Sequence, residues 1–270
     1  MKKISFISFE DNANVFTNWS SFINSVSSEY ESKSFCMKEH PYKYALHHDY
    51  NLVDLSERQK KDATQWLLDS DYVIYSEEDQ NCYFQYSTAL QFKSVLGVDP
   101  IFETLGKKIA FYSGTAYRKK SQMFNQMDQM SFDRILSPLD LYRLTNRDDK
   151  TGCIFMCEKD KISSDLIKQN IVDRFNQPEW VISHIPTNRQ IKGSDFLLKI
   201  MEKIQKTSKN PIKYIEKTGL SPQESLEIKK NSCFYIDTLS IGLGILATGA
   251  HGISSLEALS YGNLVFFFHL

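Results

Sequence analysis

The sequence has little of what a metal-binding, membrane-spanning or polyanion-binding protein needs. Its five cysteines are scattered, and no histidine lies near the one close pair, Cys153 and Cys157, to complete a zinc site. We therefore expect reduced thiols and no bound metal. No apolar run approaches the roughly 20 residues that span a bilayer. The 32 basic and 33 acidic residues give a formal net charge of −1, which argues against a nucleic-acid binder.

The N-terminal apolar stretch is too short for a signal peptide and ends at Glu10, so the sequence predicts a cytoplasmic protein. A hydrophobic content of 41% with 24% charged residues argues against disorder. Its 270 residues exceed what one ordinary core requires and suit two domains.

Short apolar runs typical of strands alternate with helical patterns along the chain, which predicts an α/β fold with parallel sheets. The alternation restarts near Pro178, so we expect an N-terminal domain over 1–175 and a second over 176–270. Strands are expected at 3–9, 72–76, 108–113, 134–136, 152–156, 180–185, 212–215, 234–237 and 263–268, with helices at 16–26, 62–70, 84–96, from 137, 166–175, 194–204, from 221 and 254–260.

The last seven residues, LVFFFHL, read as a central parallel strand with no helix after it. A sheet of this type is covered on both faces. We therefore expect the second domain to be incomplete at its C-terminus.

Glycine is concentrated near one candidate site. None precedes Gly97, yet five of the 11 glycines fall between 242 and 262, after a strand ending in Asp237. A glycine-rich loop leading into a helix can cradle an anion with backbone N–H groups. Glu257, expected in the first turn of that helix, could accept hydrogen bonds from a ribose diol. The alternative is a flexible loop and a glutamate favoured by the helix dipole.

A second candidate site follows the strand at 180–185. Arg189 and Lys192 lie three residues apart in a loop at the carboxyl end of that strand, where open α/β sheets bind ligands. Two cations there could neutralise a diphosphate leaving group without a metal. The alternative is two solvated loop charges.

Several segments together resemble the GT-B glycosyltransferases related to glycogen synthase. Residues 183–196, SHIPTNRQIKGSDF, resemble the entry H-x-P-[ST]-x-x-x-x-K-G-[ST] of the donor domain. Residues 233–239, CFYIDTL, followed by 249–265, GAHGISSLEALSYGNLV, resemble D-Q-L … G-x-x-G-x-x-x-x-E-A-M-A-x-G-x-P-V. Residues 107–118, KKIAFYSGTAYR, look like K-x-x-x-x-x-G-[ST]-x-x-R. The likeness is specific in the second domain and loose in the first, and Gly249 stands where many relatives have glutamate.

The resemblance implies two Rossmann-like domains facing a cleft and a metal-independent transfer of sugar from a nucleotide-sugar donor to a carbohydrate or lipid-linked acceptor. It places this reaction in bacterial surface polysaccharide synthesis, and peripheral association with the inner face of the membrane is compatible with it. It makes Arg189 and Lys192 the catalytic diphosphate clamp and Glu257 the ribose ligand. The remaining implied contacts are donor phosphate at Gly252, Ile253, Ser254 and Ser255, and acceptor at Asn14, Ser113, Gly114 and Arg118.

Two other interpretations stay open. A glycosyltransferase remnant would bind nucleotide or a protein partner without turnover, as Gly249 and the abrupt end suggest. A sugar-nucleotide epimerase of the same architecture would turn over without an acceptor, although no acidic pair is placed for that chemistry. The pair of histidines before Asp49 reads as a surface loop, since no distant partner completes a metal site.

Overall fold

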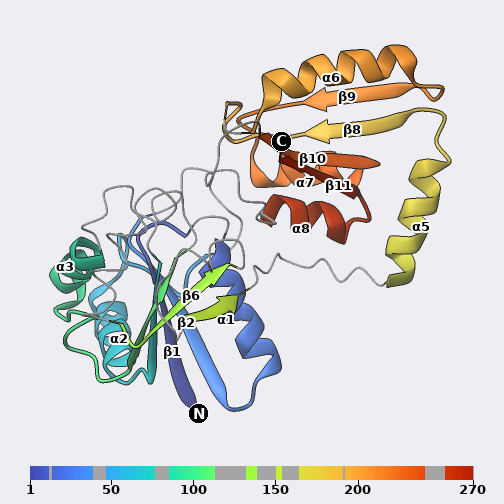
Figure 1. Ribbon diagram of the computed structural model, residues 1–270. Helices are drawn as coiled ribbons and strands as arrows, with labels where there is room; N and C mark the ends of the chain where they lie inside the picture. The colour runs from blue at the N-terminus through green and yellow to red at the C-terminus, as the bar shows by residue number, and fades with distance from the viewer. Residues whose placement is uncertain are drawn as a thin grey trace. The chain divides into compact units, whose positions relative to one another are not determined.

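The computed structural model describes residues 1–11, 14–38, 47–76, 85–112, 132–138, 150–153, 164–190, 192–240 and 253–269. The chain forms two compact units, Met1–Met156 and Cys157–Leu270 (Figure 1). Each unit has its own parallel sheet. The predicted α/β class with two parallel sheets is confirmed.

The first unit is built on a sheet of seven parallel strands in the order β3-β2-β1-β4-β5-β6-β7. This order reverses between β1 and β4, as in the doubly wound Rossmann arrangement. The strands are β1 (Lys2–Ser8), β2 (Tyr30–Cys36), β3 (Tyr50–Asn51), β4 (Tyr72–Ser76), β5 (Lys107–Phe111), β6 (Arg134–Pro138) and β7 (Lys150–Cys153).

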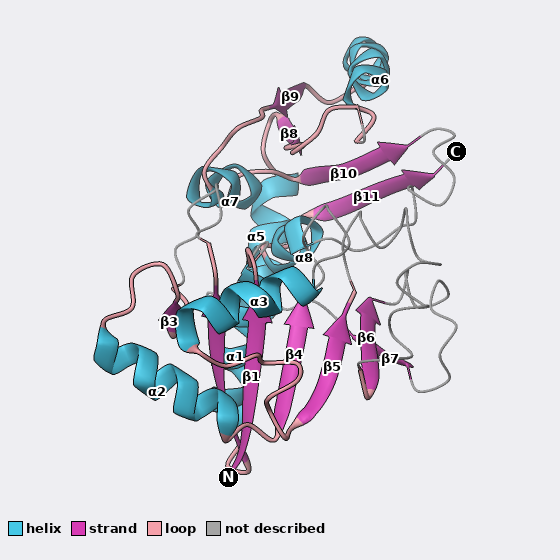
Figure 2. Ribbon diagram, turned by 90° about the vertical axis from the view of Figure 1, so that its left-hand side faces the viewer, coloured by secondary structure: helices cyan, strands magenta, loops and turns pink. Residues whose placement is uncertain are grey.

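Helices cover both faces of this sheet (Figure 2). On one face, α1 (Val15–Val26) packs Phe16 and Trp19 against Phe6 of β1 and Phe111 of β5, with ring centroids 5.0–6.0 Å apart. On the other face lie α2 (Glu57–Leu68) and α3 (Gln85–Leu96), and Leu67 is fully buried in the core there. The alternation of side chains along β1 supplies both cores, because successive residues point to opposite faces.

Several elements of the first unit differ from the sequence prediction, including β3, which was not expected. No strand was expected at Tyr30–Cys36, whose sequence YESKSFC lacks an apolar run, yet β2 pairs with β1 along its whole length. The helix expected from residue 137 is also wrong at its start. Ser137 and Pro138 continue β6 and pair with Gly152 and Cys153 of β7.

The second unit has a four-stranded parallel sheet in the order β11-β10-β8-β9. Its strands are β8 (Trp180–His184), β9 (Ile212–Glu216), β10 (Phe234–Ser240) and β11 (Leu264–His269). The helices are α5 (Ser164–Phe175), α6 (Ser194–Thr207), α7 (Pro222–Lys230) and α8 (Ile253–Ser260). α6 lies over one face of the sheet, while α7 and α8 lie on the other (Figure 1).

The division between the units falls 19 residues before the expected boundary at 175/176, because α5 belongs to the second unit. The Arg174 guanidinium donates to the Asn263 side-chain oxygen at 3.4 Å, and the Phe175 ring meets Trp180 edge-on. The turn between α8 and β11 also lies close to α5. A Cβ on Gly262, which has φ +80°, would lie 2.9 Å from the Ile171 side chain.

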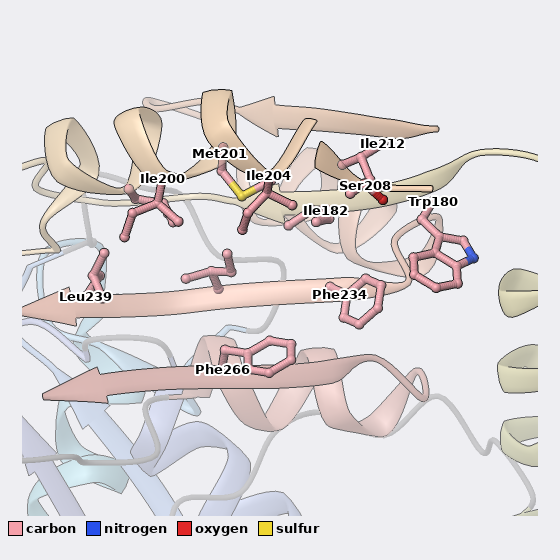
Figure 3. Close-up of a pocket in the computed structure, with 12 residues that line it drawn as sticks. Trp180, Ile182, Ile200, Met201, Ile204, Ser208, Ile212, Phe234, Leu239 and Phe266 are labelled. Carbon is pink, nitrogen blue, oxygen red and sulfur yellow. The ribbon is translucent and has the colours of Figure 1, made fainter. Parts of the chain in front are cut away.

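β11 lies at the edge of the described sheet, paired only with β10, and Leu264 and Phe266 are exposed. On the α6 face, this strand and β10 border an apolar groove of about 490 Å³ (Figure 3). Its walls include Trp180, Phe234 and Phe266 opposite α6, and Ser208 is its one hydroxyl side chain. A groove of this composition offers no charged group to a nucleotide.

Candidate functional site

The candidate site lies where the order of the second sheet changes direction. β9 lies on one side of β8, whereas β10 and β11 lie on the other. The carboxyl ends of β8 and β10 therefore flank the topological switch point, the usual ligand site of an open α/β sheet. The loop carrying Arg189 and Lys192 follows β8, and the chain after β10 leads to α8.

A β-bulge at Asp237 shapes this edge. The register between β10 and β11 shifts between Ile236 and Thr238, which makes Asp237 the extra residue. A bulge redirects a side chain and increases the local twist. Asp237 is buried, its Oδ1 accepts from Lys192 Nζ at 2.7 Å, and its Oδ2 accepts from Ser255 Oγ at 2.7 Å. One carboxylate thus joins the loop after β8 to α8.

Lys192 is held firmly but remains partly accessible. Its Nζ also donates to Thr238 Oγ1 at 2.8 Å, and its side chain is 25% exposed. Its carbonyl oxygen accepts from the Leu239 N–H at 3.0 Å, which fixes the loop on β10. The close approach of this loop to β10 requires glycine at 193. Its φ is +67°, and a Cβ there would lie 1.6 Å from the Leu239 carbonyl oxygen.

His184 has a structural role at the same edge. It is fully buried, with Nδ1 2.7 Å from the Ile236 carbonyl and Nε2 2.8 Å from Ser194 Oγ. The carbonyl requires a proton on Nδ1, so Nε2 accepts from the Ser194 hydroxyl. Burial lowers the pKa of His184 and keeps the ring neutral. The ring ties the start of α6 to β10.

Arg189 points to a different set of partners. Its guanidinium donates to Asp195 Oδ1 at 2.7 Å and forms an ion pair with Glu216 at the end of β9. Within the described residues, the ion pairs of Arg189 are with these two carboxylates and none is with α8. The structure therefore connects Lys192 to α8 through the Asp237 carboxylate, whereas it anchors Arg189 on the β9 side.

The predicted phosphate ligands are partly described. α8 begins at Ile253, and the Ser254 hydroxyl lies 2.6 Å from the Tyr235 hydroxyl. Burial raises the pKa of Tyr235, and the nearby Asp237 charge adds to the effect, so the phenol stays protonated. Ser255 donates to Asp237, as described above. Gly252 lies outside the described residues.

Glu257 lies beyond the first turn of α8, because the helix begins one residue earlier than expected. Its Oε2 accepts from Lys229 Nζ at 2.6 Å, and its side chain is 25% exposed. Lys229 comes from α7 and is almost completely buried. Sequence reasoning missed Lys229, since a lysine in the last turn of a helix normally reads as a solvated residue.

The candidate acceptor residues lie in the first unit, and only Asn14 is described. It precedes α1 in a left-handed conformation, φ 54°, and is buried. The helix start is capped instead by Asp11, whose carboxylate accepts from the backbone N–H groups of Phe16 and Thr17 at 3.0 Å. Ser113, Gly114 and Arg118 lie outside the described residues.

In the loop before β3, His47 and Asp49 are exposed as expected, whereas His48 is only partly exposed. Its side chain is 12% exposed, with Nε2 3.6 Å from Asp11 Oδ2 and Nδ1 3.3 Å from Thr17 Oγ1. Burial lowers the pKa of His48, although the Asp11 charge opposes the shift. The ring therefore fastens the segment before β3 to the start of α1.

The described ranges hold neither a metal-binding cluster nor a membrane-spanning helix. They contain no cluster of three or more histidine, cysteine, aspartate or glutamate side chains arranged for a metal ion. No helix there combines the length and the apolar character needed to cross a membrane.

No protein-family model and no curated protein matches the sequence. The likenesses found are to solved structures. One is a UDP-N-acetylglucosamine 2-epimerase, 13% identical with a TM-score of 0.45, covering 98% of this chain and 78% of that one. Another is the S. aureus MnaA–UDP co-structure, at 14% identity and a TM-score of 0.44, covering 92% and 75%. A third is MurG of Acinetobacter baumannii, at 7% identity and a TM-score of 0.37, covering 100% and 79%.

These likenesses are remote. All three TM-scores lie below 0.5, so none of them carries an argument about this chain's activity. The function proposed below is instead argued from the chain's own residues and from the motifs quoted above.

Proposed function

We propose that the second unit binds the diphosphate of a nucleotide-sugar and that the protein transfers the sugar to a carbohydrate or lipid-linked acceptor. The observation that carries the proposal is the chain of contacts from Lys192 through Asp237 to Ser255 at the switch point of the sheet. It joins the two segments that resemble the donor site of GT-B glycosyltransferases.

In this proposal the diphosphate binds between Lys192 and the start of α8. The first N–H groups of a helix lack intrahelical partners and favour an anion, and Ser254 adds a hydroxyl. Negative charge grows on the leaving diphosphate as its bond to the sugar breaks. A fixed ammonium stabilises that charge more than it stabilises the bound donor, which is how such a group lowers the barrier.

Asp237 orients the Lys192 ammonium rather than contacting the donor. The carboxylate is buried and accepts hydrogen bonds from two side chains, so it has little freedom to move. Lys192 has three N–H bonds, and Asp237 and Thr238 engage two of them. No described residue engages the third, which in this proposal donates to a phosphate oxygen.

Arg189 enters the proposal as the second cation. Asp195, which is 82% exposed, is the carboxylate that a phosphate would displace most easily from the guanidinium. Glu216 is largely buried and holds the guanidinium at the edge of the site. The acceptor residues proposed for the first unit are Asn14, Ser113, Gly114 and Arg118.

A second candidate function is nucleotide binding without transfer. It is favoured by the engagement of both candidate cations with carboxylates, which reduces the positive charge presented to a donor. The two candidate functions predict the same nucleotide binding and differ only in whether the protein transfers the sugar.

Turnover is tested by incubating the chain with UDP-glucose, UDP-N-acetylglucosamine, GDP-mannose and ADP-glucose, with and without a mixture of oligosaccharide and lipid-linked acceptors. Transfer predicts acceptor-dependent release of one nucleoside diphosphate, lost in Lys192→Ala and kept in Lys199→Ala on the exposed side of α6. Binding without release supports the second candidate. Conversion of the sugar in the absence of acceptor would identify an epimerase and contradict transfer.

A further inference from the structure

Lys229 is the most deeply buried lysine side chain of the described residues. It is 1% exposed, in the last turn of α7, where lysines usually extend into solvent. An ammonium taken out of water is costly unless a carboxylate and other polar groups compensate it. Here the compensation is a 2.6 Å hydrogen bond to Glu257 Oε2, with Nζ also 5.4 Å from the centroid of the Tyr235 ring.

The two oxygens of Glu257 have different surroundings. Oε2 is held by the buried ammonium. Oε1 has no hydrogen bond to another described residue, and the side chain is partly exposed. One side of the carboxylate is therefore fixed within the fold, and the other side makes no hydrogen bond within the described part of the chain.

The network around this pair leads to the proposed phosphate site. Lys229 Nζ lies over the ring of Tyr235, whose hydroxyl contacts Ser254 at 2.6 Å. On the same strand, Asp237 contacts Ser255. The buried lysine thus supports the α8 residues that follow the glycine-rich segment.

We propose that Lys229 is a positioning residue that fixes the rotamer of Glu257, so that Oε1 accepts from the hydroxyls of a ribose. This rests on the proposed nucleotide site and deepens it, because it makes sugar recognition depend on a residue that never touches the ligand. A purely structural role would predict that Lys229→Met lowers stability without changing the preference for ribose, since removing one partner of a buried ion pair is destabilising.

The test compares a ribonucleotide with its 2′-deoxy counterpart. The tightest binder among UDP, GDP and ADP is titrated calorimetrically into each variant, followed by its 2′-deoxy form. Wild type should prefer the ribonucleotide by about tenfold, the effect of one hydrogen bond to a charged group. Lys229→Met should reduce the preference to near one although Glu257 is still present, and Glu257→Gln should do the same.

Three controls separate positioning from general damage. Lys230→Met removes the next lysine, whose Nζ lies 5.2 Å from the Tyr261 ring centroid, and should keep the wild-type preference. Pyrophosphate affinity should be the same in all variants, because the phosphates do not meet Glu257. Adding Lys229→Met to Glu257→Gln should change the preference no further.

If Lys229→Met does not fold by circular dichroism, Lys229→Arg keeps the charge but alters its geometry and should give an intermediate preference. A full wild-type preference in a folded Lys229 variant would overturn the positioning role and leave the nucleotide site intact. An unchanged preference in Glu257→Gln would overturn the ribose contact as well. If wild type binds none of the three nucleotides, the proposed function fails together with this inference.

Discussion

The carboxylate of Asp237 contacts Lys192 through one oxygen and Ser255 through the other, each at 2.7 Å. Lys192 precedes Asp237 by 45 residues and Ser255 follows it by 18, so one carboxylate joins the loop after β8 to α8. Because Asp237 is buried at a bulge, the loop after β8 and the start of α8 are held in one fixed arrangement. A preorganised site of this kind loses little entropy when an anion binds.

Asp195→Asn should increase affinity for nucleoside diphosphates. Asp195 competes for Arg189 and is 82% exposed, so its removal frees the guanidinium without disturbing the core. Exposed ion pairs contribute at most about 1 kcal/mol, which sets the gain at up to about fivefold. Calorimetric titration measures it, with Asp165→Asn on α5 as the exposed control. Unchanged or weaker binding would show that Arg189 does not meet the phosphates.

Gly193→Ala should destabilise the second unit by more than about 2 kcal/mol, because strain at positive φ adds to a direct clash. The added Cβ would lie 1.6 Å from the Leu239 carbonyl oxygen. Gly219→Ala is the matched control, with φ +68° and nothing within 4 Å of its Cβ, and should cost about 1 kcal/mol. Urea unfolding of both variants tests the difference. Equal losses would mean that the loop does not approach β10 this closely.

His184 predicts a loss of stability on acidification. Burial lowers its pKa in the folded state below the ordinary value of 6.5, so between these two values the unfolded chain binds a proton that the folded chain does not. Its contribution is complete above pH 6.5 and is lost as the pH falls towards the folded pKa. Unfolding free energies at pH 7.5, 6.5 and 5.5 should fall less steeply in His184→Gln than in wild type. Parallel pH profiles would contradict a buried neutral ring.

Local sequence signals predicted much of the second unit. Ser221, Pro222 and Glu224 specify the start of α7, and the structure shows the expected capping box. The helix expected over 194–204 is also present as α6, with Leu197 buried in the core, although Phe196 and Ile204 are exposed. In such segments the residues that determine the structure are neighbours in the chain.

Features that depend on distant partners were not predictable. β2 is rich in serine and becomes a strand because Ser32 bonds Asn24 and Ser20 of α1, and Ser34 bonds Asp49. The burial of Lys229 depends on Glu257, 28 residues later. The link between Lys192 and α8 depends on a bulge, which no pattern in β10 indicates. Sequence spacing therefore identified the candidate segments but not the contacts that join them.

The most direct test of the central claim is binding of nucleotides to Lys192→Met. A thermal-shift screen of wild type against UDP, GDP, ADP, CMP and pyrophosphate should show stabilisation by one nucleoside diphosphate, because a ligand of the folded state raises Tm by mass action. Lys192→Met should remain folded and lose that shift, while Lys199→Met retains it. An undiminished shift in Lys192→Met, or no shift with any ligand in well-folded wild type, would contradict a diphosphate site at Lys192.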